Sequence, residues 1–107
     1  PYTTLFRSTG IDGMEGLDPT SGMSVAYTRE RVGYAVTLIG GISCLTLLNG
    51  SAEDVYAEAA ACIEAGKPGG RYILGSACAV PRFSPPENLL AAGRAARDLG
   101  LYEKERT

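Results

Sequence analysis

Apolar and polar residues follow each other in blocks that predict a strand and then a helix, three times in succession. The strands are short apolar runs, expected at Asp12–Leu17, Tyr34–Ile39 and Arg71–Leu74. The helices have apolar positions three and four residues apart and are expected at Ser24–Val32, Ala52–Ala65 and Pro85–Leu99. A nearly continuous apolar run such as Tyr34–Ile39 is typical of a parallel strand covered on both faces.

Local signals mark where these elements begin and end. Ser51 and Asp54 form an approximate capping box before the middle helix, whose buried stripe is expected to contain Val55, Ala59, Cys62 and Ile63. Ser84 is expected to cap the last helix, which is expected to bury Leu89, Ala92, Ala96 and Leu99. Gly40-Gly41 is expected to end the second strand, and a loop is expected to follow it up to the turn at Asn49.

Three consecutive βα units place the chain in the α/β class, because right-handed crossovers make successive strands parallel. A TIM (β/α)8 barrel needs eight such units and about 250 residues. This chain has 107 residues. Two architectures therefore stay open, a small open three-layer α/β domain or the C-terminal three βα units of a TIM barrel.

The first eight residues favour the second architecture. Pro1–Ser8 reads PYTTLFRS, which is the translation of the end of a widely used short-read sequencing adapter. We therefore interpret residues 1–8 as artefactual and residues 9–107 as the C-terminal fragment of a longer reading frame. The polar tail Tyr102–Thr107 is expected to be a natural C-terminus.

Composition excludes several classes of function. Ten Lys and Arg residues stand against twelve Asp and Glu, a net charge of −2, which argues against a nucleic-acid-binding surface. The sequence has no His, which excludes Ser-His and Cys-His catalytic pairs. Neither a P-loop nor a dinucleotide-binding glycine motif is present. Glycines interrupt the uncharged span between Arg31 and Glu53, so we expect no membrane helix there.

The cysteines are Cys44, Cys62 and Cys78, and their wide spacing contains no C-x-x-C pair for a zinc knuckle or a redox motif. Cys62 is expected in the core, and the position of Cys44 just past a strand allows either packing or a place at the mouth of a barrel. With no signal peptide in the sequence, we expect a reducing, cytoplasmic location.

From about Gly10 to the end, the chain resembles the C-terminal part of the uroporphyrinogen decarboxylase superfamily, which implies a TIM barrel. That superfamily contains the decarboxylase and zinc-dependent methyltransferases that act on methylated corrinoid proteins. The resemblance rests on the order and spacing of six stretches. They are Gly16–Asp18 (GLD), Glu30–Gly33 (ERVG), Val36–Gly40 (VTLIG), Leu47–Ser51 (LLNGS), Glu64–Leu74 (EAGKPGGRYIL) and Ser84–Asn88 (SPPEN).

In a barrel the chemistry takes place at the carboxyl ends of the strands. The resemblance to the corrinoid methyltransferases implies that Cys78 ligates zinc together with an upstream H-x-C pair, whereas a small buried residue is the ordinary fate of such a cysteine. The decarboxylase has a His near this position, which this chain lacks. Six further residues are candidates for substrate binding, and no catalytic residue is assigned. They are Glu15, Asp18, Gly41, Ser43, Ser76 and Arg82.

Most of these candidates also have an ordinary structural interpretation. Asp18 in D-P-T is a good turn former, and Arg82 is expected to be solvated by default. Glu15 alternates with Met14 along its strand and so points either into the barrel or toward the helices. Gly41 stands where many relatives carry Asn, so a ligand contact made there by relatives is expected to be missing here.

Three hypotheses about function follow. The first is a fragment of a zinc-dependent methyltransferase that moves a methyl group from a corrinoid, carried on a partner protein, to a thiol. The second is a cofactor-free decarboxylase of tetrapyrrole biosynthesis or a related enzyme with another small-molecule substrate. The third is a truncated polypeptide that is unstable and inactive alone, because its sheet has two open edges.

Overall fold

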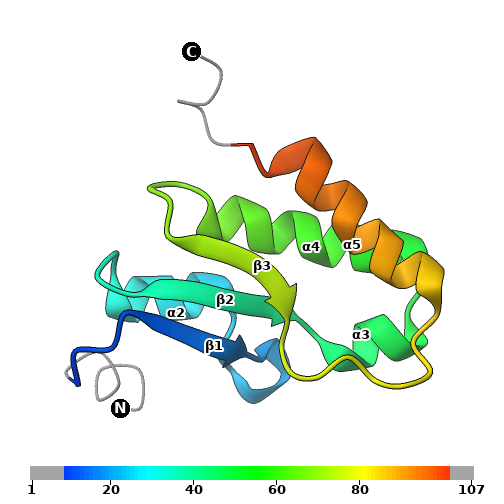
Figure 1. The fold of residues 1–107 in the computed structure, drawn as a ribbon, viewed down its shortest axis with the longest axis horizontal. Helices are drawn as coiled ribbons and strands as arrows, with labels where there is room; N and C mark the ends of the chain where they lie inside the picture. The colour runs from blue at the N-terminus through cyan, green and yellow to red at the C-terminus, as the bar shows by residue number, and fades with distance from the viewer. Residues whose placement is uncertain (1–8, 102–107) are drawn as a thin grey trace.

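Three strands and four α-helices follow one another in the computed structural model, which describes residues 9–101 (Figure 1). The predictions for Pro1–Ser8 and Tyr102–Thr107 therefore lie outside the described residues. In chain order the elements are β1 (Gly13–Leu17), a 3-10 turn η1 (Pro19–Ser21), α2 (Val25–Val32), β2 (Thr37–Ile42), α3 (Cys44–Asn49), α4 (Ala52–Gly66), β3 (Tyr72–Ser76) and α5 (Pro86–Leu99).

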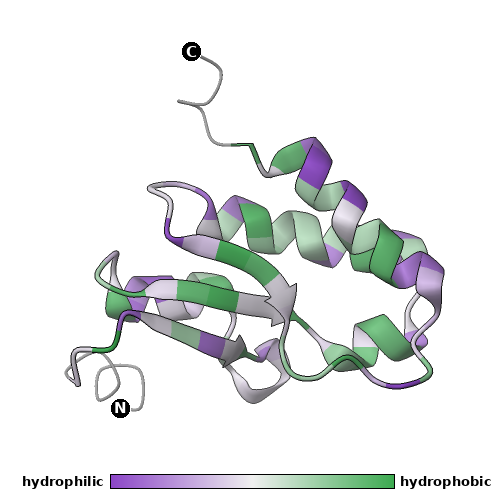
Figure 2. Cartoon of the chain, viewed as in Figure 1, coloured by the Kyte–Doolittle hydropathy of each residue, from purple (hydrophilic) through white to green (hydrophobic). Residues whose placement is uncertain are grey.

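The strands form one parallel sheet in the order β1-β2-β3, which confirms the predicted α/β class with three βα units. One core fills the space between the sheet and the helices, and it contains Leu17 and Leu38 from the sheet, Val25 from α2 and Val55 from α4. Figure 2 shows hydrophobic segments along β2 and β3, whereas β1 also carries a hydrophilic segment. The molecule therefore has one layer of strands and one layer of helices.

Within residues 9–101, no helix covers the other face of the sheet (Figure 1). Ile39 and Ile73 are register partners on β2 and β3, and Ile73 is 54% exposed. Glu15 on β1 is exposed between the buried Met14 and Leu17. A small doubly wound domain covers both faces of its sheet, whereas a barrel wall has helices on one face only. The single helical layer therefore favours the barrel-fragment architecture over the free-standing three-layer domain.

The second strand runs further than predicted, because Gly40 and Gly41 continue it instead of ending it. Gly41 has φ +115°, and an added Cβ would lie 2.7 Å from Val25 Cγ2 and 2.8 Å from Cys62 Sγ. Only glycine allows both the backbone conformation and this close approach. The two glycines therefore belong to the strand, where they allow close packing. β3 also extends past its predicted end, through Gly75 to Ser76.

The stretch expected as a loop before Asn49 contains the short helix α3. Ser43 caps it, its hydroxyl accepting a hydrogen bond of 3.2 Å from the Leu45 N–H. Six residues are too few to show a helical period, so only the capping serine signalled this element.

The face of α5 was also predicted wrongly. The buried residues are Asn88, Ala91 and Ala95, whereas Leu89 and Leu99 are exposed. Asn88 is 1% exposed and its Nδ2 donates to the carbonyl oxygens of Leu47 and Gly50, both at 2.9 Å. Asparagine is polar and is not expected on a buried stripe, so the predicted stripe lies one residue further along the helix than the buried one.

The start of α5 also differs from the predicted one. The helix begins at Pro86, and Pro85 occupies the cap position without a side-chain hydrogen bond. The hydroxyl of Ser84, the predicted cap, is buried without a hydrogen-bond partner among the described residues. The consecutive prolines move the first helical turn one residue beyond the place where Ser84 could cap it.

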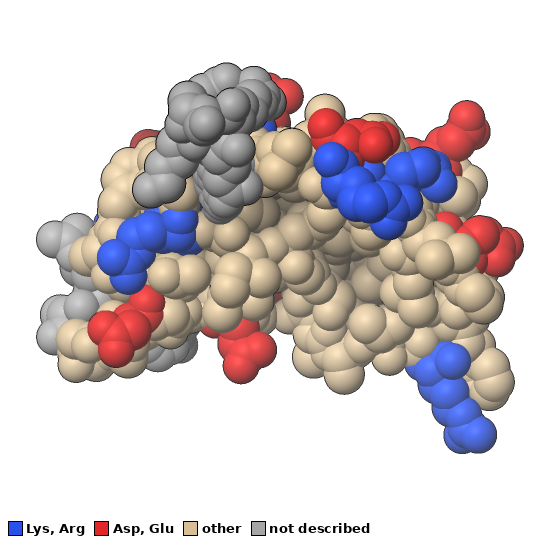
Figure 3. All heavy atoms as spheres, turned by 45° about the horizontal axis from the view of Figure 1, so that its top comes forward, with Lys and Arg blue, Asp and Glu red and all other residues tan. Residues whose placement is uncertain are grey.

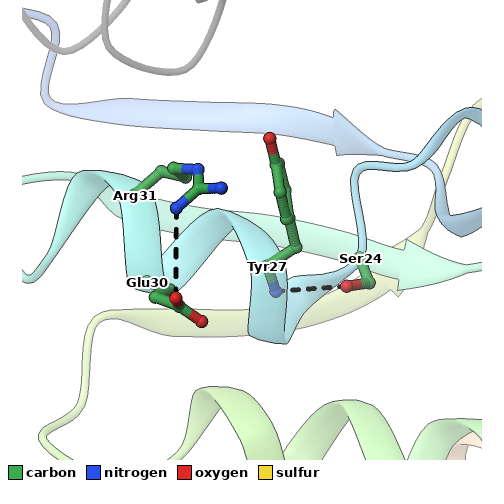
Figure 4. Close-up of polar contacts among 4 residues, drawn as sticks. All are labelled: Ser24, Tyr27, Glu30 and Arg31. Carbon is green, nitrogen blue, oxygen red and sulfur yellow. Dashed lines mark hydrogen bonds and ion pairs between the residues drawn. The ribbon is translucent and has the colours of Figure 1, made fainter.

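Two helices begin with side-chain caps: the cap at Ser51 was predicted and is confirmed, and the cap at Ser24 was not predicted. Ser24 accepts a hydrogen bond of 3.1 Å from the Tyr27 N–H at the start of α2 (Figure 4). In the last turn of this helix, Arg31 lies over the Tyr27 ring, and its Nη1 is 3.9 Å from Glu30 Oε1. The contact with Tyr27 raises the pKa of Arg31. Ser51 and Asp54 form a full capping box at α4, with hydrogen bonds of 3.0 and 3.1 Å.

A buried arginine ties the elements together at the amino end of the sheet. Arg29 on α2 is 7% exposed, and its Nη1 donates to the carbonyl oxygens of Gly33 and Val36. Its Nη2 donates to three more, which belong to Gly66, Gly70 and Arg71. These carbonyls precede β2 and β3. One guanidinium therefore joins α2 to the segments that enter both strands.

Among residues 9–101, no helix is both long enough and apolar enough to cross a bilayer. On the face drawn in Figure 3, acidic and basic side chains lie mixed around a hollowed, uncharged centre.

Candidate functional site

The carboxyl ends of the three strands meet at one edge of the sheet, where Figure 1 shows α3 and the loops after β1 and β3 together. Asp18 follows β1, Ser43 follows β2, and Cys78 lies two residues after the end of β3. Ile42 and Ser76 are register partners, so the loops after β2 and β3 are neighbours. This edge is where a βα fold places its chemistry.

Asp18 is part of a turn. Its Oδ1 accepts hydrogen bonds from the N–H and the hydroxyl of Thr20, at 2.9 and 2.6 Å. This is the capping geometry of η1 and matches the turn interpretation of D-P-T. The carboxylate is thus already engaged locally in this structure.

Ser43 and Gly41 lie toward the helical layer. Ser43 is buried, and its N–H donates to Glu58 Oε2 at 2.5 Å while its hydroxyl caps α3. Glu58 Oε1 also accepts from the Thr46 hydroxyl at 2.7 Å. Glu58 escaped the sequence analysis, because nothing in the sequence of α4 shows that this residue reaches the loop after β2.

A cleft of about 530 Å³ opens between α2 and α4, beside these residues. Gly41, Val25, Cys62 and the Glu58 side chain are among the residues that line it. Cys62 is 8% exposed, as expected of a core residue, and burial, with a smaller effect from Glu58, raises the pKa of its thiol to about 11. Such a thiol is protonated at neutral pH and is a poor nucleophile.

The loop after β3 presents Cys78 to solvent. Several hydrogen bonds hold this loop: the Ser76 hydroxyl donates to the Cys78 carbonyl, and the Ala77 N–H donates to the Ile42 carbonyl at 2.8 Å. The Cys44 thiol at the start of α3 donates to the Ala79 carbonyl at 3.5 Å. Further along the same loop, the exposed Arg82 guanidinium lies 5.4 Å from the centre of the Phe83 ring.

The predicted site residues thus fall into separate groups. Glu15 lies on the open face of the sheet, and Gly41 and Ser43 face the helices. Ser76 is the last residue of β3, and Asp18 and Arg82 sit in the loops after β1 and β3. Within residues 9–101, no group of three His, Cys, Asp or Glu side chains is arranged to hold a metal ion. In the described part of the chain, Cys78 therefore offers one exposed donor atom and no complete metal shell.

Residues 1–99 match the family described as uroporphyrinogen decarboxylase (URO-D). The chain belongs to the URO-D family. Over 75 residues it is 35% identical to a methylated-thiol–coenzyme M methyltransferase from Methanosarcina mazei, a match that covers 69% of this chain and 19% of the relative. The chain therefore spans about a fifth of the length of this curated relative.

A solved structure agrees with this assignment. A methyltransferase from Methanosarcina mazei has a TM-score of 0.79 and 25% sequence identity to this URO-D family chain, and the match covers 92% of this chain and 28% of the methyltransferase. The predicted fold, three βα units that form part of a larger TIM barrel, is confirmed by this match. Within the URO-D family, both relatives lie on the methyltransferase side.

Proposed function

We propose that this chain is part of a zinc-dependent methyltransferase that moves a methyl group from a corrinoid, carried on a partner protein, to a small-molecule thiol. The observation that carries the proposal is Cys78, an exposed thiol at the carboxyl end of β3 in a chain similar to a methylated-thiol–coenzyme M methyltransferase. Because the chain spans about a fifth of this relative, the activity is proposed for a longer protein of which this chain would be one part.

The described residues offer zinc one donor atom, the thiol of Cys78. An exposed cysteine on a loop held by several hydrogen bonds suits one corner of a zinc shell of thiolates and an imidazole, and the remaining ligands would come from outside residues 9–101. When bound with an open position, zinc binds an entering thiol as a thiolate. The chain itself would supply the Cys78 ligand, a fixed loop around it, and one wall of the barrel that excludes water.

The test begins with the source DNA. Reading the frame upstream of Ser8 is expected to reveal an H-x-C pair, and the protein encoded by that longer frame is called the parent enzyme below. We expect the parent enzyme to bind one zinc ion and to methylate a thiol from methylcobalamin. Cys78→Ser should abolish both zinc binding and activity, whereas Cys44→Ser should retain both.

Two results would contradict this proposal. A frame that opens with Met close to Thr9 would remove the parent enzyme altogether. A frame without H-x-C but with an N-terminal Arg and Asp cluster, together with a zinc-free protein, would favour the decarboxylase function of the family.

A second proposal concerns the isolated chain, which we propose is inactive. β1 and β3 are edge strands of the sheet, and Ile73 and Leu90 are 54% and 69% exposed. Unpaired edges and apolar surface of this kind promote association with other chains. Purified residues 9–107 are expected to aggregate, and a cooperative melt at a monomeric mass would overturn this.

A further inference from the structure

The cleft between α2 and α4 has the size and the walls of a small-molecule site. Its volume of about 530 Å³ falls within the range of pockets that hold small organic ligands. Its walls are mostly apolar and include Val25 from α2, Leu45 from α3 and Ala61 from α4, while Gly41 on β2 contributes no side chain. Such walls suit the apolar body of a small ligand.

A single charge lies beside this apolar space. Among the described residues that line the cleft, Glu58 on α4 is the only one with a charged side chain. Glu58 forms no ion pair within residues 9–101, where the salt bridge that is found joins Arg31 and Glu30. Its residue is partly buried, and burying a charge without a counter-charge costs free energy. A cation that enters the cleft would offset this cost.

The hydrogen bonds of Glu58 do not account for its charge. Its Oε2 accepts from the Ser43 N–H at 2.5 Å, and its Oε1 accepts from the Thr46 hydroxyl at 2.7 Å. A neutral glutamine could serve both partners, because its oxygen can accept from the N–H and its nitrogen can donate to the hydroxyl. The Thr46 hydroxyl has donated its proton to Glu58, so its oxygen can only accept a further hydrogen bond. The polar side of the cleft therefore favours a donor that carries positive charge.

We propose that this cleft binds a small organic cation, namely a protonated amine with an apolar body. The ammonium group donates hydrogen bonds to the Glu58 carboxylate and the Thr46 hydroxyl oxygen, and the apolar body lies between α2 and α4. Hydrogen bonds that involve charged groups are stronger than neutral ones, so the charge selects the ligand. The site is independent of the zinc role proposed for Cys78, because the cleft opens in the helical layer and Cys78 lies on the loop after β3.

Three probes of similar shape and different charge test this site on the protein encoded by the complete reading frame. At neutral pH, 2-phenylethylamine is a cation, 2-phenylethanol is uncharged and phenylacetate is an anion. Titrations followed by ligand-observed NMR give the dissociation constant of each probe. We expect the amine to bind at least about tenfold more tightly than either of the other two, because it alone makes a charge-assisted hydrogen bond to Glu58.

Two pairs of variants locate the bound amine. Glu58→Gln removes the charge and can keep both hydrogen bonds, so it should weaken amine binding at least about tenfold and leave 2-phenylethanol binding unchanged. Its control is Glu53→Gln, which changes an exposed glutamate on the same helix and should bind the amine normally. Ala61→Leu fills the cleft from an exposed position on α4 and should weaken amine binding, whereas Ala57→Leu adds the same side chain one turn earlier, outside the cleft, and should not.

Several outcomes would overturn the proposal. If 2-phenylethanol binds as tightly as the amine, or if Glu58→Gln binds the amine normally, the charge does not select the ligand. Equal effects of Ala61→Leu and Ala57→Leu would place the probe outside the cleft. No binding of the amine would mean that another segment of the complete protein fills the cleft or that it takes no ligand of this class. If circular dichroism shows that Glu58→Gln loses its fold, the three probes and the two alanine variants still decide.

Discussion

The two ends of the sheet use polar side chains in different ways. At the amino end, the guanidinium of Arg29 donates to five main-chain carbonyls from three segments of the chain. At the carboxyl end, polar groups act in small local sets, such as Asp18 with Thr20 and Ser76 with Cys78. The amino end is thus built as a single anchor, while the carboxyl end keeps separate loops that can be altered one at a time.

The largest effect is expected from breaking the anchor. Arg29→Met removes all five hydrogen bonds that Nη1 and Nη2 donate in a buried site and leaves carbonyls without partners, so we expect the parent enzyme to lose about 3 kcal/mol or more of its free energy of unfolding. Denaturant melts measure this loss. Arg31→Met on the same helix removes an exposed arginine, and we expect a change within about 0.5 kcal/mol. Equal losses in the two variants would contradict the anchor.

The close packing around Gly41, near the carboxyl end of β2, can be tested in the same way. Gly41→Ala would push a methyl group to 2.7 Å from Val25 Cγ2 at φ +115°, so we expect a loss of about 2–3 kcal/mol in the same melts. Gly93→Ala on α5 meets nothing within 4 Å and removes a helix-breaking residue, so it should gain about 0.5–1 kcal/mol. If both substitutions changed the free energy of unfolding in the same direction, the close packing around Gly41 would be refuted.

A smaller effect is expected from alkaline pH through the buried thiol below Gly41. The pKa of Cys62 is raised to about 11, whereas an unfolded thiol has a pKa of about 9. Between these two values the unfolded state binds fewer protons than the folded state, so stability falls as pH rises from about 9 to 11. The pKa difference of about two units corresponds to about 2.7 kcal/mol at most, and solvent screening of a partly accessible thiol reduces the expected loss to about 1–2 kcal/mol.

Denaturant melts at a series of pH values would measure this loss. Cys62→Ala should lack this part of the pH dependence, although it is less stable at every pH. An identical slope in the two proteins would contradict the assignment of the effect to Cys62.

The smallest change in the free energy of unfolding is expected for Cys78→Ser, the variant expected to lose zinc binding and activity. Cys78 is exposed, and the Ser76 hydroxyl donates to its main-chain carbonyl. Cys78→Ser keeps that carbonyl and therefore the hydrogen bond. We therefore expect its melting midpoint to correspond to a change within about 0.5 kcal/mol. A loss comparable to that of Arg29→Met would show that the carboxyl end is an anchor too.

The sequence predicted the order of the elements because each helix and strand carries its own period and its own caps. The capping box at Ser51 and the core position of Cys62 depend only on neighbours in the same helix, and both are confirmed. The errors occur where a distant segment decides the outcome. Asn88 can be buried because the carbonyls of Leu47 and Gly50 accept hydrogen bonds from its side chain. The sequence of α5 alone does not indicate that these carbonyls are nearby.

The candidate site was harder to predict for the same reason. That Cys78 follows a strand could be seen from the pattern, but the support from Cys44 and the bridge from Glu58 to Ser43 arise from the packing of α3 and α4. Arg29 could have been found. It lies four residues after Val25 and three before Val32, on the apolar face of its helix.

The Arg29 anchor has a consequence for how the enzyme would respond to acid and base. A guanidinium remains protonated throughout the pH range in which enzymes work, and the carbonyl oxygens it binds do not titrate. The amino end of the sheet should therefore stay assembled while acidic and thiol groups elsewhere gain or lose protons. Below about pH 9, where the Cys62 thiol stays protonated in the folded state, a pH profile of activity would then report the chemistry at the carboxyl end and not a loss of the scaffold beneath it.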